Sequence, residues 1–326
     1  MKHTIISWDS SFRNFFHLID GLLQQNYNRE EFEVIYVEQR SKELANKFNH
    51  NLNLKSLWDR YEEVKNQINI KVLYLNDDFT VPYHLGTCNN AALKIAKGDI
   101  ISIMDGDMLL PSDFLSQLEE AHSKGDYVYN LYRFMCPFPV NVDKQNWWKA
   151  SFLLDDCLAI CPDKGTKMPD TIDNKGPMIS AKKEYWQRIN GYDPNLIWST
   201  SVSRSGQDVC ARLEIATGSK SLCLKTSYAV HPWHPIGISV LGRGRRNELV
   251  MGLLSTQQEI IDFSRKANIF SWNERQNYTD GLLEKNRGIV NKIIKLEVLH
   301  DKITHKNSLN FIDKLKHYYI NNFILR

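Results

Sequence analysis

In DIISIMDGDMLLP, residues 99–111, an apolar run ends in two aspartates that are separated by one glycine. The run is short, uncharged and rich in isoleucine, which predicts a strand buried on both faces. Asp105, Gly106 and Asp107 follow its carboxyl end. Open α/β sheets bind ligands at that end of their strands, and two neighbouring carboxylates can share one divalent cation. A plain Asp-Gly turn is the alternative interpretation.

The residues before this stretch alternate between apolar strands and helical segments. The predicted strands cover residues 3–8, 32–39, 70–76 and 99–105. The predicted helices cover residues 10–25, 42–69 and 85–98. Such alternation predicts an α/β fold with a parallel or mostly parallel central sheet and helices on both faces.

After Pro111 the pattern continues with a helix over 112–125 and a strand over 127–135, and then it loosens. Residues 147–178 are punctuated by glycine and proline, as in segments that carry binding work. From about Gly237 the chain is helical in pattern and more polar. We therefore expect a first domain over 1–236 and a helical C-terminal extension over 237–326.

Composition narrows the classes of function and compartment. The 326 residues carry a net charge of +3, which is too small a bias to indicate nucleic acid binding without a clustered basic face. The six cysteines are scattered without a C-x-x-C pair, which is typical of a reduced, cytoplasmic protein. No apolar stretch approaches the length of a membrane span. The lysine-rich segment 291–326 is compatible with peripheral contact to an anionic membrane, or with helices packed on their own domain.

Two blocks of sequence resemble the GT-A glycosyltransferases, especially the large family 2. Residues 83–115, YHLGTCNNAALKIAKGDIISIMDGDMLLPSDFL, are similar to the central region of that family, in which an Asn- and Ala-rich helix leads into a buried strand and a D-x-D motif. Residues 176–197, GPMISAKKEYWQRINGYDPNLI, resemble the acceptor-side segment of its galactosyltransferase and N-acetylgalactosaminyltransferase members. The resemblance covers roughly residues 3–235 and implies a GT-A, Rossmann-like sheet.

The resemblance also implies a metal site. In that family the D-x-D binds Mn²⁺ or Mg²⁺, which grips the diphosphate of a nucleotide-sugar donor, and a hard cation stabilises such a leaving group without a proton. Asp107 is expected to be the direct ligand, and Asp105 to reach the ribose or the metal. The family often adds a histidine from a later loop, here YAVHPWHPIG, where His231 and His234 are both eligible and His231 is favoured.

A third signature of the family is a Glu-Asp pair whose aspartate accepts the proton of the acceptor hydroxyl. The corresponding stretch here is SRSGQDVCARL, residues 203–213, in which Gln207 replaces the glutamate and Asp208 stands at the position of the base. The resemblance therefore implies that Asp208 is catalytic. The alternative is that Asp208 caps the helix that follows it.

The donor side is expected at the ends of the first two strands. The resemblance implies donor contacts from Ser7, Trp8 and Asp9, from Glu38 and from Asn89 of the Asn-rich helix. A glycine-flanked arginine group, LGRGRRNE, suggests a lid in which Arg243 and Arg245 contact the diphosphate, since arginine binds phosphate in a bidentate manner. Arg40 is compatible with a surface charge.

These observations favour a metal-dependent glycosyltransferase that uses a UDP-sugar, with galactose, N-acetylgalactosamine or a relative as the sugar. The expected acceptor is a glycan or lipid-linked glycan of a surface polysaccharide, and a base suggests inversion. Alternatives are a retaining N-acetylgalactosaminyltransferase-like enzyme, a non-catalytic nucleotide-sugar-binding protein suggested by Gln207, and a phosphatase of the haloacid dehalogenase type. The last expects its D-x-D near the start of the domain.

Overall fold

A computed structural model describes residues 1–9, 16–51, 55–77, 85–136, 154–155, 177–194, 202–232, 257–266, 273–277, 280–281, 284–285, 287–288, 291 and 295. The strands are β1 (His3–Asp9), β2 (Phe32–Arg40), β3 (Ile70–Asp77), β4 (Ile100–Met104), β5 (Tyr129–Met135), β6 (Met178–Lys182) and β7 (Leu222–His231). The helices are α1 (His17–Leu23), α2 (Lys42–Asn51), α3 (Leu57–Val64), α4 (Leu85–Ile95), α5 (Phe114–Ser123), α7 (Lys183–Arg188), α9 (Val202–Thr217) and α11 (Gln257–Lys266).

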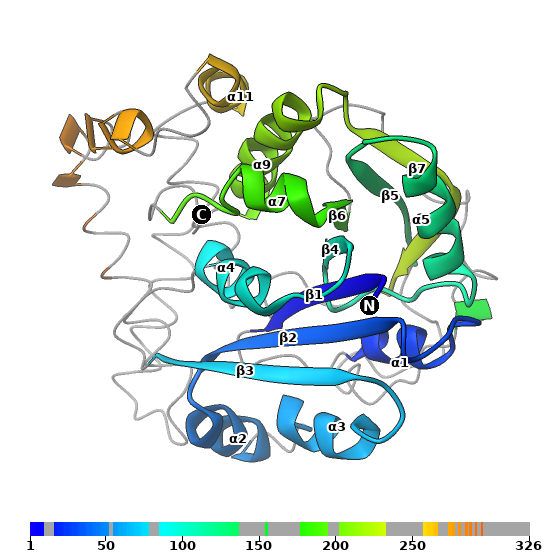
Figure 1. Cartoon of the computed structure of the whole chain (residues 1–326). Helices are drawn as coiled ribbons and strands as arrows, with labels where there is room; N and C mark the ends of the chain where they lie inside the picture. Colours follow the sequence, from blue (N-terminus) through cyan, green and yellow to red (C-terminus); the bar gives the residue numbers. More distant parts are fainter. Residues whose placement is uncertain are drawn as a thin grey trace.

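The strands form one sheet in the order β3-β2-β1-β4-β6-β5-β7. β1 pairs in parallel with β2 and β4, β2 with β3, and β5 with β7, whereas β6 runs antiparallel to both β4 and β5. The prediction of a mostly parallel α/β sheet is confirmed. The carboxyl ends of β1, β2 and β4 consequently meet at one edge of the sheet (Figure 1).

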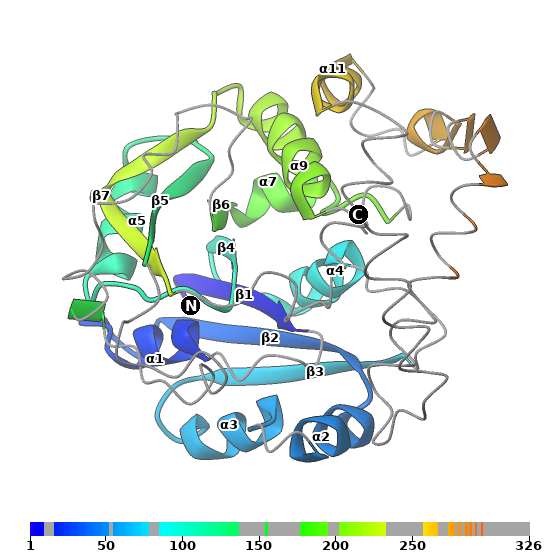
Figure 2. The ribbon, with the colours of Figure 1, turned by 180° about the vertical axis from the view of Figure 1, so that it is seen from behind.

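Helices cover both faces of the sheet. In Figure 1, α2 and α3 lie below β2 and β3, while α4 lies on the other side with α7 and α9, and Figure 2 shows the same layers from behind. The two faces bury separate apolar clusters, and neighbouring residues of one strand alternate between them: Ile5 belongs to one cluster and Ile6 to the other. All nine residues of β2 are buried, as a strand covered on both faces requires.

Some predicted boundaries were wrong. The helical region expected over 42–69 consists of two helices, because Ser56 begins α3 with a capping box: its hydroxyl accepts from the Asp59 amide at 3.1 Å and its own amide donates to the Asp59 carboxylate at 2.8 Å. For the helix expected over 10–25, α1 covers His17–Leu23; residues 10–15 lie outside the described residues, so its predicted start remains a prediction.

Beyond β7, the C-terminal part is described in α11 and in a short helical turn over 273–277. α11 lies beside α9 in both views (Figures 1 and 2). The boundary expected near 237 and most of the lysine-rich segment 291–326 lie outside the described residues, and both remain predictions. Among the helices that are described, none is long and apolar enough to cross a membrane.

Candidate functional site

The two aspartates of the D-x-D motif lie in a tight turn directly after β4. The Asp105 amide donates to the carbonyl of Pro177 at 3.0 Å, and the carbonyl of Gly106 accepts from the Leu18 amide at 3.2 Å. The turn is thus tied to α1 on one side and to the segment before β6 on the other. These backbone bonds fix where the two carboxylates leave the chain.

Gly106 is required by its surroundings. A Cβ atom at this position would overlap the hydroxyl of Tyr36 and lie 3.3 Å from Oγ of Ser7. Tyr36 and Ser7 are both buried residues of β2 and β1. The D-x-D turn can therefore lie against the ends of these strands only because its middle residue has no side chain.

The structure brings His231 to Asp107. Leu109 and Val230 exchange two backbone hydrogen bonds of 2.9 Å each, so the end of β7 is fastened beside the chain that leaves the D-x-D turn. His231 is the next residue, and its Nε2 lies 3.6 Å from Oδ2 of Asp107. The two side chains are 13 % and 6 % exposed.

This pair fits a divalent cation. A carboxylate and an imidazole both suit Mn²⁺, and neighbouring ligand atoms of one octahedral ion lie roughly 3 Å apart. No group of three or more His, Cys, Asp or Glu is arranged for a metal among the described residues. A site for a nucleotide diphosphate does not need three such protein ligands, because Mg²⁺-type sites use one or two carboxylates and leave other positions to phosphate and water. Asp105 lies at the other end of the same turn and is half-buried.

The ends of β1 and β2 form the neighbouring part of the same edge. Asp9 pairs in register with Glu38, and the Glu38 carboxylate, nearly fully buried, accepts from the Arg40 amide at 2.9 Å. Trp8 is half-buried and packs against the cluster under α4. Two expected donor residues are fully buried with side-chain polar atoms that lack a partner in the described part of the chain: Oγ of Ser7 and the amide of Asn89. Buried polar atoms are normally bonded, so these two have capacity left for a ligand.

Sequence reasoning missed two features of this edge and misjudged a third. Arg40 is fully buried, so its interpretation as a surface charge was wrong. Gln39 and Asp77 were not considered, although the Gln39 amide donates to the Asp77 carboxylate at 3.0 Å. Asp77 ends β3 opposite Arg40. The signal was available, because Asp77 follows a strand in the same manner as Asp105.

Asp208 lies in an unexpected setting. α9 begins at Val202, so the helix-cap alternative was wrong. Oδ2 of Asp208 accepts from Nε and Nη2 of Arg212 at 3.1 and 2.8 Å. Oδ1 of Asp208 accepts from Oγ of Ser264 at 2.6 Å and from Nη2 of Arg275. Burial alone would raise the pKa of Asp208, but the two guanidinium groups outweigh it and hold that pKa at about 2. The carboxylate is charged, 1 % exposed and engaged on both oxygens.

Three expected site residues lie outside the described residues: His234, Arg243 and Arg245. The metal role of His234 and the arginine lid therefore remain predictions. Most of the segment 147–178, which is expected to take part in binding, is likewise outside them.

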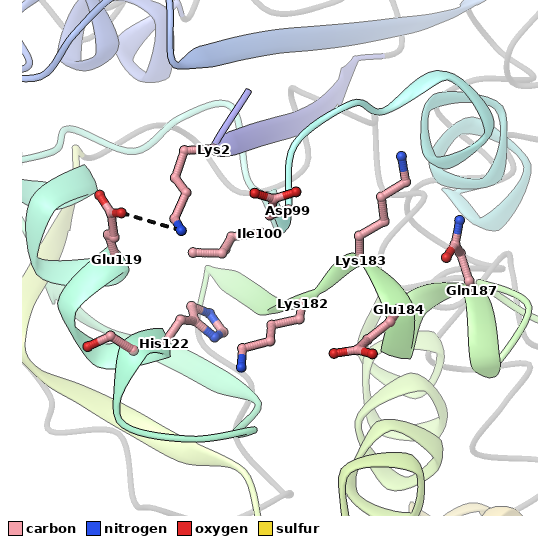
Figure 3. Close-up of a pocket in the computed structure, with 10 residues that line it drawn as sticks. Lys2, Asp99, Ile100, Glu119, His122, Lys182, Lys183, Glu184 and Gln187 are labelled. Carbon is pink, nitrogen blue, oxygen red and sulfur yellow. Dashed lines mark ion pairs between the residues drawn. The ribbon is translucent and has the colours of Figure 1, made fainter.

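A cavity of about 490 Å³ lies at the opposite edge of the sheet, where β4 begins (Figure 3). The three lysines that line it have partners: Lys2 lies 3.5 Å from Glu119, Lys182 lies 2.5 Å from Asp126, and Lys183 donates to the carbonyl of Ala96 at 2.8 Å. The cavity is separated from the D-x-D turn by the length of β4. We assign no function to it.

No protein-family model and no curated protein sequence matches this chain. Solved structures do. Residues 1–349 of S. aureus TarS align with a TM-score of 0.50 and 14% identity, covering 98% of this chain and 87% of that one, and TarS was also solved in complex with UDP-GlcNAc. The mannosyltransferase PcManGT from Pyrobaculum calidifontis, in complex with GDP-Man and Mn²⁺, aligns with a TM-score of 0.51 and 13% identity, covering 99% of this chain and 87% of that one.

A third structure, GalNAc-T7 with UDP, GalNAc and Mn²⁺, aligns with a TM-score of 0.52 and 11% identity. That alignment covers 86% of this chain and 54% of the other. These neighbours are GT-A-type glycosyltransferases. At such low identities they show the fold, and the chain has the GT-A fold that its D-x-D stretch predicted.

Proposed function

We propose that this protein is a metal-dependent glycosyltransferase that uses a nucleotide-sugar donor. One observation carries the proposal: Asp107 and His231, which are more than a hundred residues apart in sequence, meet at the carboxyl edge of β4. The GT-A neighbours crystallised with UDP-GlcNAc, with GDP-Man and Mn²⁺, and with UDP, GalNAc and Mn²⁺ support it.

Different residues of this edge would bind different parts of the donor. Asp107 and His231 would hold the cation, with Asp105 beside them, and the cation when bound would offset the negative charge that develops on the diphosphate leaving group. Gly106 lets the turn lie against Tyr36, which keeps both carboxylates at the edge. Glu38 offers a buried acceptor for an N–H of the nucleoside base, and Ser7 and Asn89 offer the hydrogen-bonding capacity already described.

The finer assignments are proposed from the resemblance. The donor would be UDP-galactose, UDP-N-acetylgalactosamine or a relative, and the acceptor a glycan or lipid-linked glycan of a surface polysaccharide, reached in the cytoplasm with peripheral membrane contact through the basic C-terminal segment. Inversion would need a carboxylate at the acceptor hydroxyl. The buried, doubly ion-paired Asp208 argues against that residue. Retention stays the alternative, because residues 191–194, GYDP, resemble a motif of retaining N-acetylgalactosaminyltransferases.

A second candidate function is nucleotide-sugar binding without transfer. It is favoured by Gln207, which stands where the family has an acidic residue, and by the engagement of both Asp208 oxygens. A binding protein would keep the donor edge and lack turnover.

The test is release of nucleoside diphosphate from UDP-galactose, UDP-N-acetylgalactosamine, UDP-N-acetylglucosamine and GDP-mannose, each with and without Mn²⁺ and with a mixture of glycan acceptors. We expect metal-dependent release from at least one donor, lost in Asp107→Ala and kept in the matched variant of an exposed aspartate, Asp113→Ala. Donor binding without release from any donor would instead support the binding protein.

A further inference from the structure

Four buried charged side chains form one connected group between the catalytic domain and the C-terminal part. Arg275 donates from Nε to Oδ2 of Asp193 at 2.8 Å and from Nη2 to Oδ1 of Asp208. Arg212 donates to the other oxygen of Asp208. All four side chains are buried, and their formal charges balance.

The two oxygens of Asp208 have different partners. Oδ2 is held within α9, by Arg212 one turn further on. Oδ1 is held by the C-terminal part of the chain, through Ser264 of α11 and Arg275 of the turn over 273–277. The Arg275 guanidinium also lies 5.3 Å from the ring centre of Phe263, so α11 and this turn are joined to each other as well.

The same group fixes the Gly-Tyr-Asp turn that precedes α9. Nη1 of Arg212 donates to the carbonyls of Ile189 and Gly191 at 2.9 and 2.7 Å. The Asn90 side chain of α4 bonds both the amide and the carbonyl of Tyr192, at 2.8 and 2.9 Å. Asp193 follows directly, so Arg275 completes a turn that is already fastened from α4 and α9.

We propose that Asp193 and Asp208 are positioning residues that anchor the C-terminal part of the chain, with Arg275 inserted between them. In this arrangement the C-terminal part is fastened to α9 and to residues 176–197, the segment that resembles an acceptor side. Asp208 binds Arg275 and Arg212 and does not accept a proton from the acceptor hydroxyl. A carboxylate that serves as a base must reach the proton it abstracts. Every hydrogen bond described for the Asp208 carboxylate comes from an arginine or from Ser264.

Charge balance provides the test, because removing one charged member leaves the buried group with a net charge, whereas removing Asp208 and Arg275 together leaves Asp193 and Arg212, whose formal charges still cancel although each loses a partner. We would compare Asp208→Asn, Arg275→Gln and the double variant in the full chain, with Lys266→Gln, an exposed change at the end of α11, as control. The readouts are the midpoint of urea unfolding, the affinity for UDP with Mn²⁺, and nucleotide release from the preferred donor.

We expect each single variant to lower the unfolding midpoint clearly, and the double variant to lose less than the sum of the two single losses and to keep turnover within a few fold of the unchanged protein. A folded, UDP-binding double variant whose turnover has fallen about a hundredfold or more would overturn the proposal, since that is the loss expected when a base is removed. A rise in turnover of Arg275→Gln would overturn it too, because Arg275 would then be blocking Asp208.

The kinetic readout rests on the proposed function, whereas the unfolding readout does not. If the unchanged protein shows no nucleotide release, the proposed function fails, and the anchor is still tested by whether the double variant loses less stability than the sum of the two single losses. Additive losses would contradict the anchor.

Discussion

Gly106 shows how much one residue determines at the candidate site. It lies between the two aspartates, and the space that its missing side chain would take is filled by the Tyr36 hydroxyl. The sequence identified Asp105 and Asp107 from their place after a strand, but it gave no reason for a glycine between them other than a turn. The reason is the contact with β2, which only the folded chain provides.

We predict that Gly106→Ala lowers the affinity for UDP and Mn²⁺ while the protein stays folded. The added methyl group must displace the Tyr36 hydroxyl or push the turn outward, and because Tyr36 is buried we expect the turn to move and Asp107 to shift relative to His231. Overpacking of this kind costs about 1–3 kcal/mol. Titration calorimetry and thermal unfolding would measure both effects, and the double variant Gly106→Ala/Tyr36→Phe should regain part of the affinity. An unchanged affinity in Gly106→Ala would show that the turn does not position the ligands.

At Asp208, contacts with distant residues argue against the role that the local motif implied. A motif match placed a carboxylate at the position of a base, and the match is real at the level of sequence. Which groups surround that carboxylate depends on Ser264 and Arg275, which lie 56 and 67 residues further along the chain. No local pattern contains that information, because the pairing is made by the packing of α11 on α9.

At the scale of elements, strands and helices of the first half were largely predictable, and their assembly was not. Alternating apolar runs indicated β1 to β4 and the helices between them. The antiparallel insertion of β6 between β4 and β5 is a non-local pairing, and so is the bridge between Leu109 and Val230 that brings His231 to Asp107. The histidine was predicted from the resemblance, since hydropathy has no means of linking residues this far apart.

The capping box of α3 yields a prediction for an element away from the site. Ser56→Ala removes the acceptor for the Asp59 amide and should lower the free energy of unfolding by about 0.5–2 kcal/mol. Because α3 packs beside β3 and outside the candidate site, the affinity for UDP should not change. Urea unfolding combined with calorimetry would separate the two. A loss of UDP affinity without a loss of stability would mean that α3 takes part in donor binding.

At the scale of the whole molecule, two buried histidines make stability depend on pH. Burial lowers the pKa of His3 to about 4 and that of His122 to about 3. Unfolded histidine has a pKa near 6.5, so below that value the unfolded chain binds protons that the folded chain does not. Stability should therefore fall as the pH drops from about 6.5 towards 4.

By about pH 5 each histidine would contribute a loss of up to roughly 2 kcal/mol. The measurement is the free energy of urea unfolding at neutral pH and near pH 5, in the unchanged protein and in His122→Gln. The variant should lose less stability on acidification than the unchanged protein. Equal losses in both would show that His122 does not remain neutral in the fold.

If Asp107 and His231 hold a divalent cation for a nucleotide diphosphate, UDP binding must depend on that cation and on both side chains. UDP is titrated calorimetrically into the unchanged protein, Asp107→Ala and His231→Ala, with Mn²⁺ and with a chelator. The account predicts binding that needs Mn²⁺ and that weakens by at least about a hundredfold in Asp107→Ala, with a substantial loss in His231→Ala. UDP binding of the same strength without metal and in both variants would contradict it.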